Sequence, residues 1–158
     1  MWRRTAYLIL LLQFSLGAIG QDVELRMRPL VWTGAKGSSP TFEMSVLNRT
    51  STPIQVVNLE RHPNLVIAAY CDLVAMRGGQ NYMDKVLYLI VKPPMVSREQ
   101  LRELAPGESM AFVWNSFLGD PNQLPVGTFE MHSTCPMLVK TPKLALRSNV
   151  VQYTVNEN

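Results

Sequence analysis

The sequence predicts an all-β domain, an immunoglobulin-like antiparallel β-sandwich of about eight strands with one short helix. Two observations predict it. Short segments in which apolar and polar residues alternate follow one another along the chain, as in strands with one buried face. Clusters of Gly, Pro, Asn and Ser, which favour turns, separate these segments at short intervals. So many short strands in one domain favour a sandwich over a closed barrel.

Alternation of apolar and polar residues places most of the strands. Two further runs, 65–76 and 86–91, are apolar on both faces and are predicted as central strands. Residues 98–104 are predicted as the short helix, because Ser97 and Gln100 match a capping box. The segment 141–148 is the weakest of the expected elements. The alternating strands are expected near residues 23–27, 42–46, 54–59, 109–115, 128–135 and 150–155.

The stretch LAPGESMAFVW combines a tight turn with a half-buried strand. Pro106 presets one backbone angle of the turn and Gly107 supplies the unusual one. Met110, Phe112 and Trp114 then alternate with smaller residues, so they share one face of the strand. We therefore expect Trp114 to be a core residue between the sheets.

The first twenty residues have the three parts of a secretory signal peptide. Arg3 and Arg4 precede an apolar run, and Ala18 and Gly20 are the small residues before the expected cleavage site. Cleavage after Gly20 leaves residues 21–158 as a single domain. The alternative is an uncleaved membrane anchor, although the apolar run is shorter than the roughly 20 residues that span a bilayer. The sequence therefore predicts an exported protein, periplasmic or extracellular, with no membrane span after cleavage.

Charge and composition exclude some classes of partner. The chain has 15 Lys and Arg against 12 Asp and Glu, and removal of the signal leaves 13 against 12. A protein that binds nucleic acid would need Lys and Arg clustered on one face, so no nucleic-acid partner is predicted. With 47% hydrophobic and 17% charged residues, the chain is expected to fold rather than to remain disordered.

The two cysteines, Cys71 and Cys135, are predicted to form one disulfide, because an exported chain folds in an oxidising compartment. In extended strands Cys71 shares a face with Leu73, and Cys135 shares a face with Phe129 and Met131. Both faces are apolar, so we expect the bond to join two facing sheets. The alternative is a pair of separate buried thiols.

The stretch MHSTCPM contains the soft ligands that copper prefers, namely Met131, His132, Cys135 and Met137. In an extended strand His132 and Cys135 lie on opposite faces, because their separation is odd. A blue-copper site would also need further histidine, and the only other one is His62. The sequence predicts neither a metal site nor a cofactor.

No residue pattern for catalysis stands out. No serine lies in a G-x-S-x-G elbow, and Ser109 is expected to begin a strand. Glu99, Glu103 and Glu108 are close in sequence, but we expect them on a solvated helix face and a turn. The sequence therefore predicts a protein that is not an enzyme.

The triplet Asn48-Arg49-Thr50 matches the acceptor sequence for N-glycosylation. The match matters only in a secreted protein of eukaryotic origin. In either case we expect Asn48 to lie in an exposed turn.

Three strings, FEMSVLNRTSTPIQV, LAPGESMAFVWN and LPVGTFEMHS, share a layout with a known class of domain. A strand ends in Asn before a Ser/Thr/Pro turn, a Pro-Gly-Glu turn precedes a strand with Trp, and Pro-x-Gly-Thr precedes an aromatic residue. This layout resembles bacterial immunoglobulin-like domains and is similar to the intracellular proteinase inhibitor family over residues 42–133. The resemblance implies a sandwich that works by contact. The chain departs from that family in its export signal and over residues 63–95, so no inhibitory residue is transferred.

The predicted function is that of an exported, non-catalytic binding module whose loops contact a protein partner. Inhibition of a protease or hydrolase is one form of this function. The alternative is a structural or accessory subunit of a cell-envelope assembly, for which an uncovered sheet edge is expected. The segment Lys92-Pro93-Pro94-Met95 is the candidate contact, because its prolines limit the entropy lost on binding; otherwise it is a rigid connector. The candidate loops are 77–84, 92–96 and 117–125.

Overall fold

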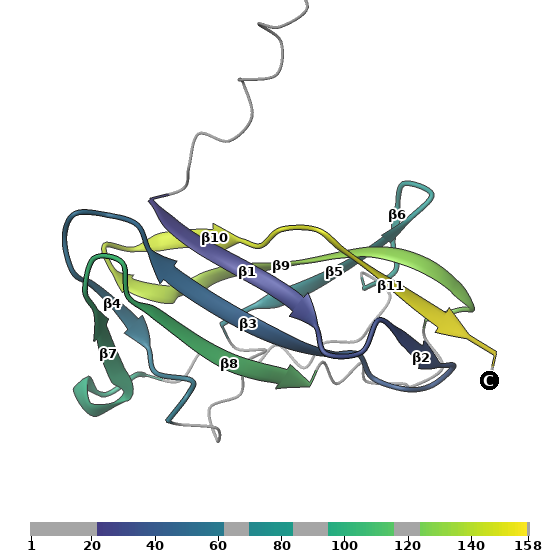
Figure 1. Ribbon diagram of the computed structural model, residues 1–158, viewed down its shortest axis with the longest axis horizontal. Helices are drawn as coiled ribbons and strands as arrows, with labels where there is room; N and C mark the ends of the chain where they lie inside the picture. The colour runs from purple at the N-terminus through teal and green to yellow at the C-terminus, as the bar shows by residue number, and fades with distance from the viewer. Residues whose placement is uncertain (1–21, 62–69, 84–94, 116–123, 158) are drawn as a thin grey trace, which may run out of the picture.

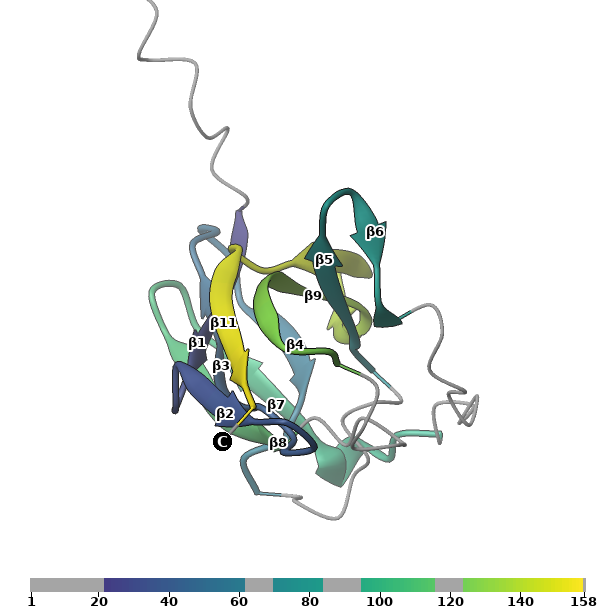
Figure 2. The ribbon, with the colours of Figure 1, turned by 90° about the vertical axis from the view of Figure 1, so that its right-hand side faces the viewer.

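The computed structural model describes residues 22–61, 70–83, 95–115 and 124–157, and these are almost entirely β-strand and turn (Figure 1). Two sheets form the layers of an immunoglobulin-like β-sandwich (Figure 2), which confirms the predicted fold class. The strands are β1 (Val23–Pro29), β2 (Thr33–Ala35), β3 (Thr41–Asn48), β4 (Ile54–Val57), β5 (Asp72–Arg77), β6 (Gln80–Asn81), β7 (Leu101–Leu104), β8 (Ser109–Asn115), β9 (Gly127–Thr141), β10 (Leu144–Arg147) and β11 (Val151–Asn156).

Hydrogen bonding defines the two sheets. The first has the strand order β1-β3-β8, and the second has the order β2-β11-β9-β4-β7, with β5 and β10 also paired to β9 and β6 paired to β5. Among the named strands, β2 and β11 run parallel, and the other described pairs are antiparallel. β2 and β6 are three and two residues long, which is too short for an alternating pattern to predict them.

Strict alternation gives the first sheet one apolar face and one polar face. Leu25, Val46 and Met110 are aligned across β1, β3 and β8, and all three are buried. Trp114 lies opposite Phe42 and is only 6% exposed, which confirms its predicted place in the core. The sequence pattern of period two is therefore realised on all three strands.

The second sheet is built on β9, which changes partners along its length. Pro136, which has no N–H to donate, lies in the stretch where the register with β10 shifts. β9 is longer than predicted, because its later residues pair with β10 and β4. Residues 127–131 pair with β11, 130–134 with β5, 134–139 with β10, and 139–141 with β4.

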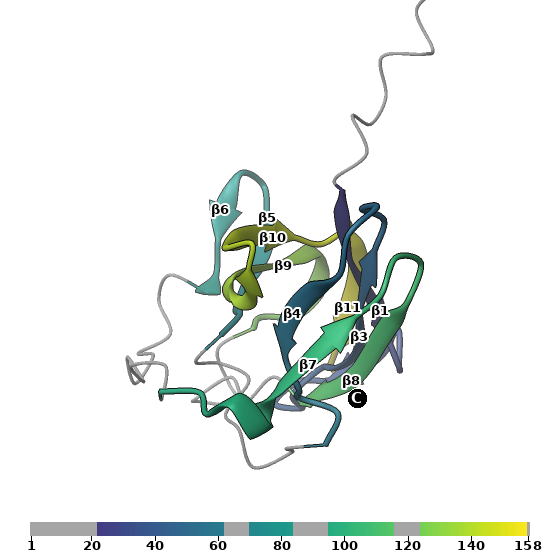
Figure 3. The ribbon, with the colours of Figure 1, turned by 90° about the vertical axis from the view of Figure 1, so that its left-hand side faces the viewer.

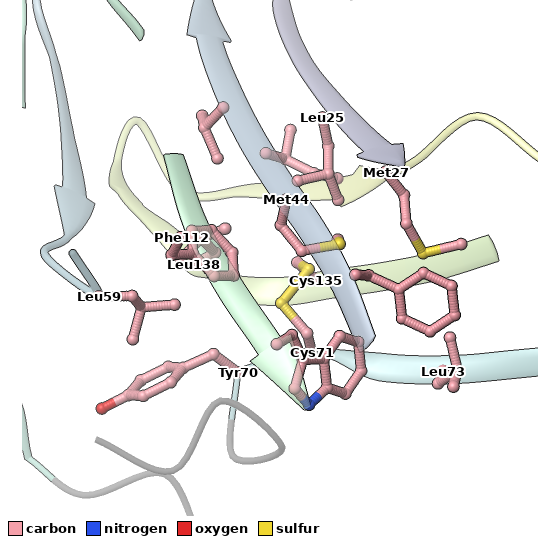
Figure 4. Packing of buried hydrophobic residues seen from close by; sticks show 14 of the residues in the cluster. Leu25, Met27, Met44, Leu59, Tyr70, Cys71, Leu73, Phe112, Cys135 and Leu138 are labelled. Atoms are coloured by element: carbon pink, nitrogen blue, oxygen red, sulfur yellow. A yellow bond between two sulfur atoms is a disulfide. The ribbon is translucent and has the colours of Figure 1, made fainter. Parts of the chain in front are cut away.

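One apolar core fills the space between the two sheets. The rings of Phe42 from the first sheet and Tyr153 from the second meet edge to face, with centroids 6.5 Å apart. Figure 4 shows part of this core, in which Met44 and Leu138 surround a central disulfide. The core therefore takes side chains from both layers of the sandwich.

The disulfide joins Cys71 to Cys135, with an S–S distance of 2.07 Å (Figure 4). Cys71 immediately precedes β5 and Cys135 lies in β9, and these strands are neighbours in the second sheet. Asp72 pairs with Thr134, so the cysteines lie opposite each other on adjacent strands. The expectation that the bond joins two facing sheets is wrong. Residue alternation reports which face a side chain occupies, but it does not identify the partner strand.

Asn48 ends β3 and is fully buried, so the expectation of an exposed turn is wrong. Its Nδ2 donates hydrogen bonds of 2.9 Å to the carbonyl oxygens of Thr52 and Leu104. Its Oδ1 accepts hydrogen bonds from the N–H and the hydroxyl of Thr50. Both N–H groups of the amide are used in the fold, so the triplet serves a structural turn rather than a glycan.

Residues 98–104 form one helical turn and then a strand, instead of the predicted helix (Figure 3). The turn is a 3-10 helix at Arg98–Gln100, and the Ser97 N–H donates to the side chain at its end, as in a capping box. The following residues become β7, which pairs with β4 and buries Leu104. Local helix propensity is a weak preference, and pairing with an open strand edge overrides it here.

Some expected elements lie outside the described residues. They are the signal peptide, residues 1–20, the strand at 86–91, and the start of the run at 65–76, whose last part is β5. Within the described ranges, no helix has the length and apolar character needed to cross a membrane.

We predict that Trp114→Ala lowers the free energy of unfolding by about 3 to 5 kcal/mol, because it leaves a cavity beneath β8. Val150→Ala is the control, since Val150 is 53% exposed and lies outside β8. Circular dichroism during guanidinium unfolding measures both variants. Equal stability of the two would show that Trp114 does not support the core.

We predict that replacing Cys71 and Cys135 together by alanine costs about 4 kcal/mol, because the bond closes a loop with a sequence separation of 64. Unfolding of the oxidised protein and of the variant gives the difference. Mass spectrometry of the unreduced protein should find no free thiol. Two thiols that react freely with an alkylating reagent would contradict the bond.

Candidate functional site

A groove of about 770 Å³ opens beside the turn between β5 and β6. It draws its residues from parts of the chain that are far apart in sequence. Arg77, Gly78, Gln80 and Tyr82 come from the β5–β6 hairpin, and Lys36 follows β2. The remaining residues lie before β9 and after β11. The full lining is Lys36, Arg77, Gly78, Gln80, Tyr82, Pro125, Val126 and Glu157.

The β5–β6 hairpin forms one wall of the groove, and its sequence explains its tight turn. Gly78 and Gly79 both have positive φ, at 57° and 78°, as the two-residue turns of twisted hairpins require. Arg77 and Gln80 are the paired residues on either side of this turn. The Asn81 side chain accepts a hydrogen bond of 3.1 Å from the Met83 N–H and so holds the chain that follows β6.

Arg77 is held in place by two contacts. Its Nη1 donates a hydrogen bond of 2.7 Å to the Val126 carbonyl oxygen, and its guanidinium lies 5.7 Å from the centre of the Phe129 ring. Tyr82 packs edge to face on that ring, with centroids 5.3 Å apart. Gly127 makes room for the arginine, because a Cβ there would lie 2.4 Å from Nη1. The hairpin is thereby fixed to the start of β9.

Lys36 and Glu157 give the groove two exposed charges of opposite sign. They come together because the Lys36 N–H donates a hydrogen bond of 2.8 Å to the Asn156 carbonyl oxygen, next to Glu157. Within the described part of the chain, neither residue takes part in an ion pair. Both charges are therefore available to a ligand in the groove.

The structure brings two of the three predicted loops to this groove. Loop 77–84 contributes the hairpin residues, and loop 117–125 contributes Pro125. Lys36 and Glu157 were not predicted, because the parallel pairing of β2 with β11 brings them together and leaves no local sequence pattern.

The predicted contact segment Lys92-Pro93-Pro94-Met95 is not brought to the groove by the described structure. Lys92, Pro93 and Pro94 lie outside the described residues. Met95 is 99% exposed and does not line the groove. The contact predicted for this segment therefore stays a prediction.

The residues considered for metal binding do not form a site in the described ranges. Cys135 is held in the disulfide, and His132 is on the other face of β9. Partial burial lowers the pKa of His132, and the nearby charge of Arg147 lowers it further. Over the residues that the structure describes, no three or more His, Cys, Asp or Glu side chains are grouped to hold a metal ion.

The residues considered for catalysis belong to different elements. Ser109 begins β8 on the exposed face, as predicted. The three glutamates do not share a helix face, because Glu99 is in the 3-10 turn, Glu103 is in β7 and Glu108 follows the Pro-Gly turn. A hydrogen bond from Arg102 holds the pKa of Glu108 below its usual value, and a bond from the Ala105 N–H assists. Glu108 therefore has a structural role at the turn.

Three solved structures resemble this chain at low sequence identity. No protein-family model matches the sequence, and no curated protein gives a significant match to it. A sporulation control protein from Bacillus subtilis matches 88% of this chain at 8% identity with a TM-score of 0.47, and this chain spans 51% of that one, about half its length. A FixG-related protein from Vibrio parahaemolyticus matches 87% of this chain and 99% of its own at 9% identity, with a TM-score of 0.39. A CARDB domain from Pyrococcus furiosus matches 87% and 96% at 10% identity, with a TM-score of 0.38.

We predict that Gly127→Ala destabilises the protein by about 1 to 3 kcal/mol, because φ is 141° there and the new Cβ would clash with Arg77. The same substitution should cost less in an Arg77→Ala background, where the clash is gone and only the backbone strain remains. Urea unfolding of the four proteins in this cycle measures the coupling. An equal cost in both backgrounds would contradict a role for Gly127 in seating the arginine.

Proposed function

We propose that this protein is an exported, non-catalytic binding module, and that its groove binds an extended segment of a protein partner. Two observations support export. The first twenty residues have the form of a signal peptide, and the disulfide between Cys71 and Cys135 is of a kind that persists in oxidising compartments. Binding would leave the covalent chemistry of the partner unchanged.

The groove itself carries the proposal. Its volume of about 770 Å³ and its open form give room for a few residues of an extended chain. Arg77 is fixed by the Val126 carbonyl oxygen, so one wall is in place before a ligand binds. Lys36 and Glu157 offer charges of both signs, which favour a segment with complementary charges.

Inhibition of a protease or hydrolase is the specific form of this proposal. An extended segment of an enzyme near its active site would be the ligand. The resemblance of residues 42–133 to the intracellular proteinase inhibitor family supports this form through a shared layout of strands and turns. Lys36 and Glu157 of the groove lie outside that range, so their charges support binding independently of the resemblance.

The second candidate function is a structural or accessory subunit of a cell-envelope assembly. The observation that favours it is the outer edge of β8, which pairs with no described strand. Such an edge offers backbone N–H and C=O groups to another strand. The groove and this edge lie in different sheets, so variants distinguish the two functions.

We predict that Lys36→Glu and Glu157→Lys each weaken binding to the partner by about tenfold, because each places a wrong charge in the groove. Lys143→Glu, in the exposed turn between β9 and β10, is the matched control and should bind as the wild type does. Capture from the extracellular or periplasmic fraction of the source cells identifies the partner, and titration calorimetry with it gives the dissociation constants. Equal affinity of all four proteins would contradict the groove as the binding site.

The captured partner also decides between the two functions. Recovery of one protease or hydrolase whose activity falls on addition of the protein would support inhibition. Recovery of envelope components by the groove variants as well as the wild type would support the structural alternative.

A further inference from the structure

The first sheet ends in a strand whose outer edge has no partner in the described structure. β8, Ser109–Asn115, is seven residues long and pairs with β3 along its whole length. None of the described strands pairs with its other edge (Figure 1). An edge of this length presents a row of backbone N–H and C=O groups that can pair with a further strand.

The opposite edge of the same sheet is covered. The Asn149 side chain accepts a hydrogen bond of 2.8 Å from the Met27 N–H and donates one of 3.1 Å to the Met27 carbonyl oxygen. Ser148 forms an isolated β-bridge with Leu25, two residues before Met27 on β1. The chain between β10 and β11 thus occupies the edge of β1, and β8 is the edge of the first sheet that no described strand pairs with.

Charge is distributed unevenly across the outer face of this sheet. β1 carries Glu24, Arg26 and Arg28 there, and Glu43 lies on the middle strand, β3. β8 carries no charged residue. Proteins commonly protect an exposed edge strand with lysine or another charge, and here the charges lie on the covered edge instead. β8 therefore lacks the charged residues that protect exposed edge strands, and in this respect it resembles a strand with a partner on both sides.

The sequence of β8, SMAFVWN, is complementary to itself when it is read in the opposite direction. In an antiparallel pair centred on Phe112, Ser109 faces Asn115 of a second copy and Ala111 faces Val113. On the exposed face, polar residues then meet polar ones and small apolar residues meet each other. Cross-strand pairs matched in this way stabilise a sheet.

We propose that two copies of this protein associate through β8 in antiparallel register about Phe112. The strand order becomes β1-β3-β8-β8-β3-β1, a continuous sheet with its uncharged strands at the centre and its charged strands at the rims. The pairing is symmetric, since each copy presents the same edge to the other. No residue of β8 lines the groove, so both grooves stay open, and the dimer offers two identical sites to a partner.

Substitutions at Ala111 and Val113 test the register, because both side chains are exposed and each faces the other residue in the second copy. Ala111→Lys with Val113→Lys places lysine opposite lysine twice and should raise the dimer dissociation constant about tenfold or more. Ala111→Lys with Val113→Glu places lysine opposite glutamate twice and should restore the dimer. Val150→Lys is the control, since Val150 is 53% exposed and lies away from the edge.

Sedimentation equilibrium of the secreted protein and its variants over a range of concentrations measures the association. Far-UV circular dichroism and the midpoint of urea unfolding establish that each variant is folded. A dimeric wild type, a dissociated double-lysine variant and a dimeric lysine–glutamate variant would support the proposal. A wild type that stays monomeric at millimolar concentration would overturn it, and so would a double-lysine variant that remains as dimeric as Val150→Lys. Loss of the dimer in the lysine–glutamate variant would overturn the register about Phe112.

Discussion

The passage of the chain between the two sheets depends on the buried side chain of Asn48. Its amide donates to the carbonyl oxygens of Thr52 and Leu104, and its backbone N–H and C=O bond with Glu108 and Gly107. The chain crosses from β3 to β4 and returns from β7 to β8 beside this residue, so one amide fixes both crossings. A buried polar group left without a partner costs about 1 to 3 kcal/mol, and Asn48 satisfies several such groups at once.

β9 is the strand to which most other strands of the second sheet are paired. It pairs with β11 and β5 near its start and with β10 and β4 near its end. The second sheet therefore carries the β5–β6 hairpin beside the first half of β9, and β4, where the chain arrives from the first sheet, beside the second half. The disulfide ties Cys135 of β9 to the residue before β5, and Arg77 at the end of β5 bonds back to the Val126 carbonyl oxygen just before β9. β5 is thus secured to the same strand at both of its ends. The groove wall that it carries is thereby tied to β9 and to the residue before β9.

The sequence predicted what depends on alternation and little that depends on pairing. Met110 and Trp114 are buried as expected, because period two reports a face directly. The helix expected at residues 98–104 does not extend beyond its first turn, because the later residues pair with the edge of β4 as strand β7. This pairing outweighs their weak preference for helix. Of the groove, the sequence predicted the loop that contains the glycines of the β5–β6 turn. It did not predict the contribution of Lys36, because the parallel pair of β2 and β11 brings together residues about 120 apart in sequence.

The two surfaces of this protein differ in what a partner must supply. In the groove, Arg77 already has its hydrogen bond and its aromatic contact, so a ligand gains little by displacing it. Lys36 and Glu157 are without ion-pair partners among the described residues, and a ligand that pairs with them would be selected by its charge pattern. At its outer edge β8 presents backbone N–H and C=O groups. Hydrogen bonding to them requires an extended strand in the partner and depends little on the partner's sequence. Under the proposed function, recognition by charge pattern belongs to the groove, and the β8 edge serves the proposed dimer, in which its partner is the same strand of a second copy.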